Sequence, residues 1–269
     1  MANKYSTKKA SIFSTGCKPS IYDSRDFCIT ECKNLKYVTS PPTRRARLGV
    51  ASTLYPRQNL SLYQWTTPVT NQGRLQSCVG HATVAALELL RNKQGKDRTN
   101  LSEAFTWYKA RLAQGWQTQN TGTYIRDALK SLLHDGVVEE QYFPYNDEDY
   151  KTSPPWLANL AARWTRIKAF YDCENVEGVK LAIDNGMPVV IGANIGSGFR
   201  NYVGNGSGVL VQDLNANYGH AMMLLAYDDS RNAFLIKNSW SAQWALNGYL
   251  WASYDWFNAQ VFEAWAVNA

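Results

Sequence analysis

A thiol stands where an apolar helical pattern begins: Cys78, in the stretch TNQGRLQSCVGHATVAALELL at 70–90. A thiol becomes nucleophilic when it ionises, and the partial positive charge of a helix N-terminus lowers its pKa. This position therefore favours a nucleophile. The alternative is a buried cysteine that serves as a small apolar side chain, as many lone cysteines do. The nucleophile is the better interpretation if the chain also supplies a base, a group that orients it and donors that stabilise an anion.

The chain has three histidines, so each can be considered as the base. His81 lies one turn deeper in the same helical pattern, and we expect it in the core between two halves of the protein. His134, in LLHDG, is expected at a helix C-terminus, where a cation favours the helix dipole. His220 follows Gly219 and opens an apolar strand pattern. A strand start that faces a cleft is well placed for catalysis, so His220 is the predicted base.

Two further residues could complete such a site. Asn238 ends a strand pattern eighteen residues after His220, and its amide oxygen could accept the imidazole N–H. An asparagine there is also an ordinary turn residue. Trp240 could cover this bond and exclude water. Gln72 precedes Cys78 by six residues, and its amide N–H could converge with the backbone N–H of Cys78 on a developing oxyanion.

The surrounding patterns change along the chain. Residues 57–165 carry helical periodicity, whereas residues 166–269 carry short apolar runs separated by Gly, Asn and Asp. The expected helices are 78–95, 102–115 and 123–136, with one later helix at 175–186. The expected strands are 186–195, 208–214, 220–229, 232–240 and 248–257. Helices followed by strands predict an α+β protein with a helical half, a half built on an antiparallel sheet or open barrel, and a cleft between them.

Residues 1–56 differ from the rest. They contain ten Lys and Arg against three Asp and Glu, while the whole chain has a net charge of +6. We interpret them as a basic extended arm or a short prosegment, partly packed on the body. SPPTRRAR at 40–47 is either a processing site or a solvated run of charge. Nucleic-acid binding by this arm is not predicted, because no aromatic interleaving accompanies the charge.

The cysteine count bounds the chemistry further. Five cysteines, an odd number, do not suggest a disulfide scaffold. Cys17, Cys28 and Cys32 could be imagined around zinc, but no histidine lies nearby as a fourth ligand, so we predict no metal and no cofactor. No apolar run reaches membrane-span length, and the N-terminus lacks a secretory pattern. We expect a cytoplasmic protein as synthesised, with export by another route left open, and no membrane partner. The oligomeric state is not determined.

PVTNQGRLQSC, YGHAM and KNSWSAQWALNGY together resemble the papain-like (C1) cysteine peptidases, over residues 60–256. The resemblance implies a helical left domain and a β-barrel-like right domain with the active-site cleft between them. It implies that Cys78 is the nucleophile, that His220 forms a thiolate–imidazolium pair with it, that Asn238 orients His220, and that Gln72 completes the oxyanion hole.

Several positions depart from the family pattern. The cysteine that often precedes the nucleophile is Leu75, the following Trp is Val79, and the Phe of the familiar WAF is His81. The glycine of NSWG is Ser241, and the glycine expected after Trp244 is Ala245. Bacterial and phage-type members often lack the adjacent disulfide and vary here. These changes alter the cleft walls more than the chemistry.

The same resemblance suggests positions that bind substrate. Gly122 corresponds to a glycine stretch whose backbone pairs with extended substrate, while Gly192 and Ala221 fall near the main specificity pocket. A turn glycine and a packed strand are the alternative interpretations. The predicted function is hydrolysis of peptide bonds in a protein or peptide substrate, with residues 1–56 as arm or prosegment. An amidase or acyltransferase using the same site, and a binding protein with a silent cleft, remain as alternatives.

Overall fold

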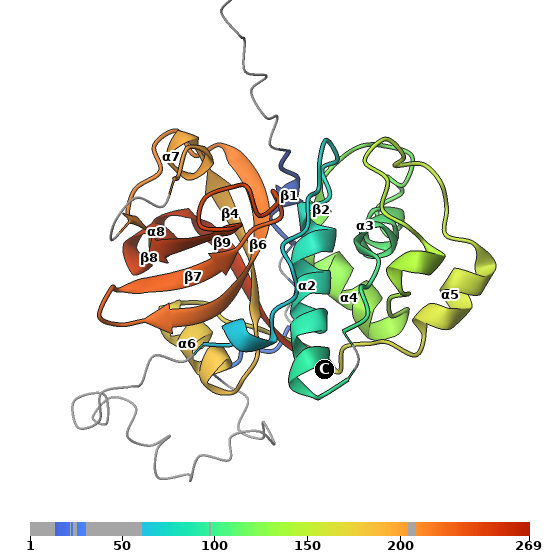
Figure 1. The fold of residues 1–269 in the computed structure, drawn as a ribbon, viewed down its shortest axis with the longest axis horizontal. Helices are drawn as coiled ribbons and strands as arrows, with labels where there is room; N and C mark the ends of the chain where they lie inside the picture. Colours follow the sequence, from blue (N-terminus) through green and yellow to red (C-terminus); the bar gives the residue numbers. More distant parts are fainter. Residues whose placement is uncertain (1–13, 22, 24–25, 31–60, 97, 204–207) are drawn as a thin grey trace, which may run out of the picture.

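Two halves of different secondary structure lie side by side in the computed structural model, which describes residues 14–21, 23, 26–30, 61–96, 98–203 and 208–269 (Figure 1). The basic run at 40–47 and Cys32 of the imagined zinc cluster lie outside the described residues. The helices and strands then follow the predicted order, with helices before strands. The sheet half, at the left of Figure 1, is an open sheet and not a closed barrel.

The helical half is built around α2 (Cys78–Lys93), which is buried along most of its length. This helix packs on α3 (Glu103–Leu112) and α4 (Ile125–His134) on one side, and on the sheet on the other. Ser102 caps α3, because its side chain accepts the N–H of Phe105. The remaining elements of this half are η2 (Tyr63–Trp65), β2 (Thr123–Tyr124), η3 (Glu140–Tyr142) and α5 (Trp156–Ala162).

A seven-stranded sheet forms the other half, in the order β3-β9-β4-β6-β7-β8-β5. Its pairs are antiparallel except β5 with β8. The strands are β3 (Ala169–Asp172), β4 (Val189–Ile195), β5 (Val209–Leu210), β6 (Tyr218–Asp228), β7 (Ala233–Lys237), β8 (Tyr249–Ser253) and β9 (Val261–Asn268). The central strands β4 and β6 are almost wholly buried, since α2 covers one face of the sheet.

Two sequence predictions in this half were wrong. Besides α6 (Val176–Asp184), the structure has α7 (Ser197–Arg200) and α8 (Tyr254–Gln260), so one helix was too few. The strand predicted over 248–257 ends at Ser253, whose side chain accepts the N–H of Trp256 and so starts α8. Aromatic residues made that helix look like a continuing strand. Strand β9 was not predicted.

Part of the N-terminal arm packs on the body. β1 (Cys17–Lys18) pairs in parallel with β2, and Cys28 forms an isolated bridge with Asp172 of β3. Arg126 of α4 forms ion pairs with Asp23 and Asp26 of the arm, and the Nε–Oδ1 distance to Asp26 is 2.9 Å. All three side chains are largely buried. The described portion of the arm is therefore fixed to both halves.

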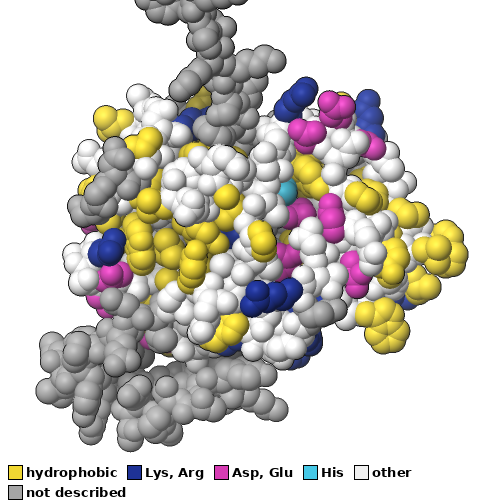
Figure 2. All heavy atoms as spheres, in the orientation of Figure 1, with side chains coloured by type: hydrophobic (Ala, Val, Ile, Leu, Met, Phe, Trp, Pro, Cys, Tyr) yellow, Lys and Arg dark blue, Asp and Glu magenta, His cyan; other side chains and the backbone are white. Residues whose placement is uncertain are grey.

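Several large apolar side chains are exposed on and beside α5. Trp156, Leu157 and Leu160 of α5 are exposed, as is Trp164 just beyond it, and they lie at the right edge of Figure 2. Within the described part of the chain, no helix is long and apolar enough to cross a membrane.

Candidate active site

Cys78 is the first residue of α2 and is fully buried. Burial raises the pKa of its thiol to about 12, while backbone N–H groups of Ala221, Val79 and Gly16 beside the sulfur oppose this increase. Ala221 directly follows His220, so the contact places strand β6 against the thiol. The sequence prediction that the thiol starts a helix is confirmed, and the sulfur lies between the two halves.

His220 and Asn238 lie together on neighbouring parts of the sheet. Nε2 of His220, on β6, is 2.8 Å from Oδ1 of Asn238, which follows β7 directly. The indole of Trp240 stacks on the imidazole with ring centroids 4.7 Å apart. All three side chains are buried, so the indole keeps water from the bond.

Neighbouring hydrogen bonds determine the tautomer of His220. The backbone N–H of Ser239 donates to the same Asn238 atom at 2.8 Å, which identifies that atom as the amide oxygen. Because this oxygen accepts, Nε2 of His220 must carry the hydrogen. Nδ1 then holds a lone pair, and it is buried without a hydrogen-bond partner among the described residues. Burial lowers the pKa of His220 to about 4, so the ring is neutral at pH 7.

Gln72 is fully buried and held at both ends of its amide. Ser239 Oγ donates to Oε1 at 2.7 Å, and Nε2 donates to the carbonyl of Leu75 at 2.9 Å. A carbonyl accepts only, so the Leu75 contact identifies the nitrogen. One of the two amide hydrogens remains for another acceptor. Ser239 thus contacts both Gln72 and Asn238, a link that the sequence analysis did not find.

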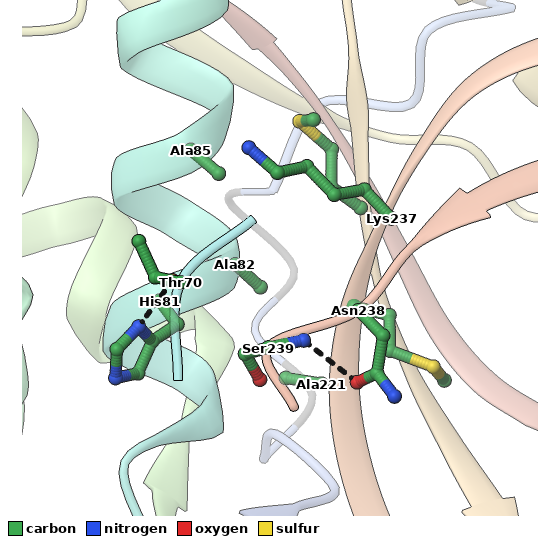
Figure 3. A pocket seen from close by; sticks show the side chains of 10 residues that line it. Thr70, His81, Ala82, Ala85, Ala221, Lys237, Asn238 and Ser239 are labelled. Carbon is green, nitrogen blue, oxygen red and sulfur yellow. Dashed lines mark hydrogen bonds between the residues drawn. The ribbon is translucent and has the colours of Figure 1, made fainter. Parts of the chain in front are cut away.

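A small cavity of about 10 Å³ lies between α2 and strands β6 and β7 (Figure 3). Figure 3 shows His81 on α2 pointing away from Asn238 toward Thr70, and Nδ1 of His81 is 2.8 Å from Thr70 Oγ1. Glu103 lies 3.3 Å from the same nitrogen. His81 is therefore buried and bonded to side chains of the helical half, whereas the residue after His220, Ala221, presents its N–H to the Cys78 sulfur.

Residues 14–18, the cleft segment, lie across the position of Cys78. The N–H of Gly16 donates to Gly219 O at 3.0 Å in the sheet half, and Gly16 O accepts from Thr123 N at 2.9 Å in the helical half. Trp240 Nε1 donates to the carbonyl of Ser14 at 3.1 Å. The backbone of this segment therefore spans the two halves directly above the nucleophile.

The predicted substrate positions also meet the cleft segment. A Cβ built on Gly122 would lie 1.9 Å from Gly16 O, and one on Gly192 would lie 2.5 Å from the ring of Phe262 and 3.0 Å from Cys17 Sγ. Gly192 pairs with Ala221 across β4 and β6. The N–H of Gly122 itself donates to Gln76 Oε1, so the pairing with Gly16 comes from its neighbour Thr123.

Two cysteines of the imagined zinc site, Cys17 and Cys28, lie among the described residues. No group of three His, Cys, Asp or Glu side chains among the described residues is arranged to hold an ion. Cys17 Sγ lies 3.9 Å from Glu263 Oε1, and Cys28 Sγ lies 2.9 Å from Thr30 Oγ1. These two cysteines therefore occupy separate places on the sheet half.

The model of the papain family of cysteine proteases matches residues 57–263, which is most of the chain. The chain belongs to the papain family. This is a family of cysteine-type peptidases, which are hydrolases, and the predicted resemblance is confirmed.

Two papain-family relatives show how far the likeness reaches. An uncharacterized peptidase C1-like protein of Acanthamoeba polyphaga mimivirus is 25% identical over 243 residues, which cover 84% of this chain and 77% of that protein. Chymopapain of Carica papaya is 28% identical over 68% of this chain, and the match spans about half of chymopapain, 51%.

Solved structures of papain-family proteins share the fold. Xylellain, a cysteine protease from Xylella fastidiosa, superposes with a TM-score of 0.75 at 24% identity, covering 95% of this chain and 96% of xylellain. Bromelain from Ananas comosus, solved in complex with the E-64 inhibitor, gives 0.65 at 20% identity, covering 78% and 98%. At these identities the likeness shows the fold.

The departures from the family pattern are accommodated locally. Leu75 and Val79 are buried with no polar atom to satisfy, so both fill apolar space beside Cys78. Ser241 and Ala245 stand where the family has glycine, and their φ angles are +67° and +48°. A side chain in this left-handed region costs roughly 1 kcal/mol, which is the physical reason why glycine is usual there.

Proposed function

We propose that the chain hydrolyses peptide bonds through a thioester acyl-enzyme, with Cys78 as nucleophile, His220 as base, Asn238 as the orienting group and Gln72 as an oxyanion donor. One observation carries the proposal: the His220–Asn238 bond of 2.8 Å lies beneath Trp240, and the residue after His220 presents its N–H to the Cys78 sulfur. A packed apolar cysteine needs neither an oriented imidazole nor a free ring nitrogen.

The first half of the reaction makes the thioester. The thiol proton of Cys78 passes to Nδ1 of His220, and the sulfur attacks the substrate carbonyl carbon. The oxyanion forms between the Cys78 N–H and the remaining amide hydrogen of Gln72. The tetrahedral intermediate collapses as the C–N bond breaks, and the imidazolium gives its proton to the departing amine.

The second half releases the acid. Neutral His220 takes a proton from a water molecule as its oxygen attacks the thioester carbonyl. The C–S bond then breaks, the sulfur leaves and recovers the proton, and the carboxylic acid departs. Asn238 accepts from Nε2–H throughout, so the ring keeps Nδ1 directed at the reacting atoms.

The substrate is a protein or peptide chain that lies where the cleft segment lies now. Gly122, Gly192 and Ala221 line that track, since a side chain on either glycine would meet the segment. A peptide backbone fits here because the track offers Thr123 N and Gly219 O, a donor and an acceptor on opposite walls.

The cleft segment makes the folded chain latent in this proposal. It uses the same backbone groups that a substrate would use, and it presents the N–H of Gly16, and not a carbonyl carbon, to the sulfur. An N–H offers nothing for a thiolate to attack, so the segment blocks the site without being cleaved there. This assigns an inhibitory role to the packed part of residues 1–56.

No contact of the described residues favours an amidase or an acyltransferase over a peptidase. A silent binding cleft is the remaining alternative, and it is decided by whether Cys78 reacts.

The test is labelling by E-64, measured as a second-order rate with intact mass and peptide mapping. The full chain with Gly16→Leu is compared with wild type, because a Cβ at Gly16 would lie 2.5 Å from Gln76 O and the segment could not seat. We expect labelling at Cys78 to be roughly tenfold faster or more, since the rate follows the fraction of open molecules. Ile21→Ala is the matched control, as that side chain is 73% exposed in the same arm.

Three results would contradict these statements. Equal labelling rates for wild type and Gly16→Leu would show that the cleft segment does not inhibit Cys78. A Cys78 adduct that still forms in the double variant Gly16→Leu, His220→Ala would show that His220 is not the base. The absence of any adduct on Cys78 in both chains, with no peptide turnover, would leave a binding protein with a silent cleft.

A further inference from the structure

Tyr145 connects Gln72 with Ser77, the residue before Cys78, although it lies outside the three sequence motifs. Its hydroxyl lies 2.8 Å from the carbonyl oxygen of Gln72 and 2.5 Å from Ser77 Oγ. The carbonyl can only accept, so the phenol donates to Gln72 and Ser77 donates to the phenol. A directed chain thus runs from Ser77 through Tyr145 to Gln72.

The two ends of this chain carry the donors of the proposed oxyanion hole. Ser77 is followed directly by Cys78, whose N–H is one donor, and Gln72 carries the other on its side chain. Both Ser77 and Gln72 are fully buried. The distance between the two donors therefore depends on how their backbones are joined, and Tyr145 joins them.

The hydroxyl of Ser77 bonds to Tyr145 and does not cap α2. Ser77 occupies the N-cap position of α2, where a serine side chain commonly accepts a backbone N–H of the first turn. Here the side chain makes no capping bond and reaches Tyr145. The missing capping bond lowers the stability of the first turn of α2, which carries Cys78.

Tyr145 is itself held by contacts of its ring and of its backbone. Its ring meets His81 edge-on with centroids 4.8 Å apart, and its backbone N–H donates to Glu140 Oε1 at 2.5 Å. His81 in turn is 2.8 Å from Thr70 Oγ1. This gives the substituted family position, His81, a place in the same arrangement, since its ring supports the tyrosine.

We propose that Tyr145 is a positioning residue that sets the spacing between the Cys78 N–H and the Gln72 amide. The inference rests on the proposed function, and it extends it to a residue far from the three sequence motifs. The hydroxyl acts through the two backbones and touches no substrate.

The spacing of the two donors matters in the transition state and not in substrate binding. The two donors meet a full negative charge only when the carbonyl becomes tetrahedral, so their spacing affects kcat and leaves KM unchanged. Displacement of iodide from iodoacetamide by the thiolate makes no such oxyanion. Tyr145→Phe should therefore lower kcat on a peptide amide about tenfold, less than the loss of a whole donor, and leave the alkylation rate of Cys78 unchanged.

The experiment uses the full chain with Gly16→Leu as parent, so that the cleft segment does not limit any rate. Tyr145→Phe, Ser77→Ala and their combination are compared with the parent on the peptidyl amide that the parent hydrolyses best from a library. Tyr142→Phe is the matched control, because that phenol is 56% exposed in the same region of the chain. The pH dependence of iodoacetamide alkylation is recorded for each variant.

The proposal is supported if both single variants lose kcat alone, the control does not, and the double variant is no worse than either single. It is overturned if KM rises while kcat stays, or if the alkylation profile falls with kcat, because either result assigns Tyr145 to the fold in general. A parent that neither alkylates at Cys78 nor turns over peptide overturns the proposed function, and this inference with it. An active parent with an unaffected Tyr145→Phe overturns the inference only.

Discussion

The charge states of Cys78 and His220 follow from burial beneath the cleft segment. Burial raises the pKa of the thiol to about 12 and lowers that of the imidazole to about 4, so both groups are neutral at pH 7. Transfer of the proton would create two charges in a site without solvent. The thiolate–imidazolium pair of the proposed mechanism therefore forms when residues 14–18 leave and solvent or substrate enters.

The buried His220 makes folding stability depend on pH. Its folded pKa of about 4 is below the unfolded value of about 6.5, so the unfolded chain binds the proton more readily. The contribution is complete above pH 6.5 and is lost as pH falls toward 4, by about 3 kcal/mol. We expect the difference in unfolding free energy between wild type and His220→Gln to shrink by that order between pH 7 and pH 4.5.

Denaturant unfolding across this range measures the difference. The change of this free-energy difference with pH reports His220, since carboxyl groups titrate equally in both chains. A difference that stays constant would show that the ring is solvated in the folded protein.

Among the elements, Arg111 of α3 holds the loop that leads to Gly122. Its guanidinium is 1% exposed and donates to the carbonyls of Gln117, Gln119 and Tyr150 at 2.5–3.2 Å. It stacks on Trp107 at 3.4 Å. Burial lowers the pKa of Arg111 to about 10, which still leaves it charged at pH 7. A cation with carbonyl partners thus holds the approach to Gly122.

Arg111→Met should therefore cost about 3 kcal/mol of unfolding free energy, because three carbonyls lose the buried, charged donor that they share. Chemical denaturation measures this value. Lys109→Met on the same helix is the control and should cost little, since its contact with the half-exposed Asp135 is at 4.0 Å. A cost for Arg111→Met no larger than that of the control would contradict the role of Arg111 in the loop.

In the molecule as a whole, the described residues of the arm, 14–21, 23 and 26–30, contact both halves. The cleft segment bonds to Thr123 on one side and Gly219 on the other, and Asp23 and Asp26 then pair with Arg126 of α4. The ion pairs lie beyond the cleft but hold the same stretch of chain. Loss of Arg126 should raise the fraction of molecules with the segment out of the cleft.

We expect Arg126→Gln to speed E-64 labelling of Cys78 severalfold, and less than Gly16→Leu does, because the backbone bonds of the segment remain. Lys130→Gln on the same helix controls for the loss of one positive charge. High salt should reduce the effect only weakly, since the pairs are largely buried. Identical labelling of Arg126→Gln and the control would show that the ion pairs do not retain the segment.

Local patterns in the sequence were enough to predict the order of the elements and the places of the proposed catalytic residues in them. Cys78 at a helix start, His220 at a strand start and Asn238 at a strand end were read from local patterns, which depend on neighbours a few residues away. The same reading failed at Ser253, where aromatic residues of α8 continued the appearance of β8. Periodicity also gave no reason to choose Tyr145 among sixteen tyrosines.

The tertiary structure decided which distant residues meet. Gly16 bonds to Gly219, Ser239 to Gln72, and Tyr145 to both Gln72 and Ser77, across separations of 68 to 167 residues for the side-chain bonds. No local pattern encodes such pairs, because they form only when the whole core has packed and fixed both partners. The arm's place in the cleft is of this kind: its composition indicated an extended segment, and the packed halves determined where it lies.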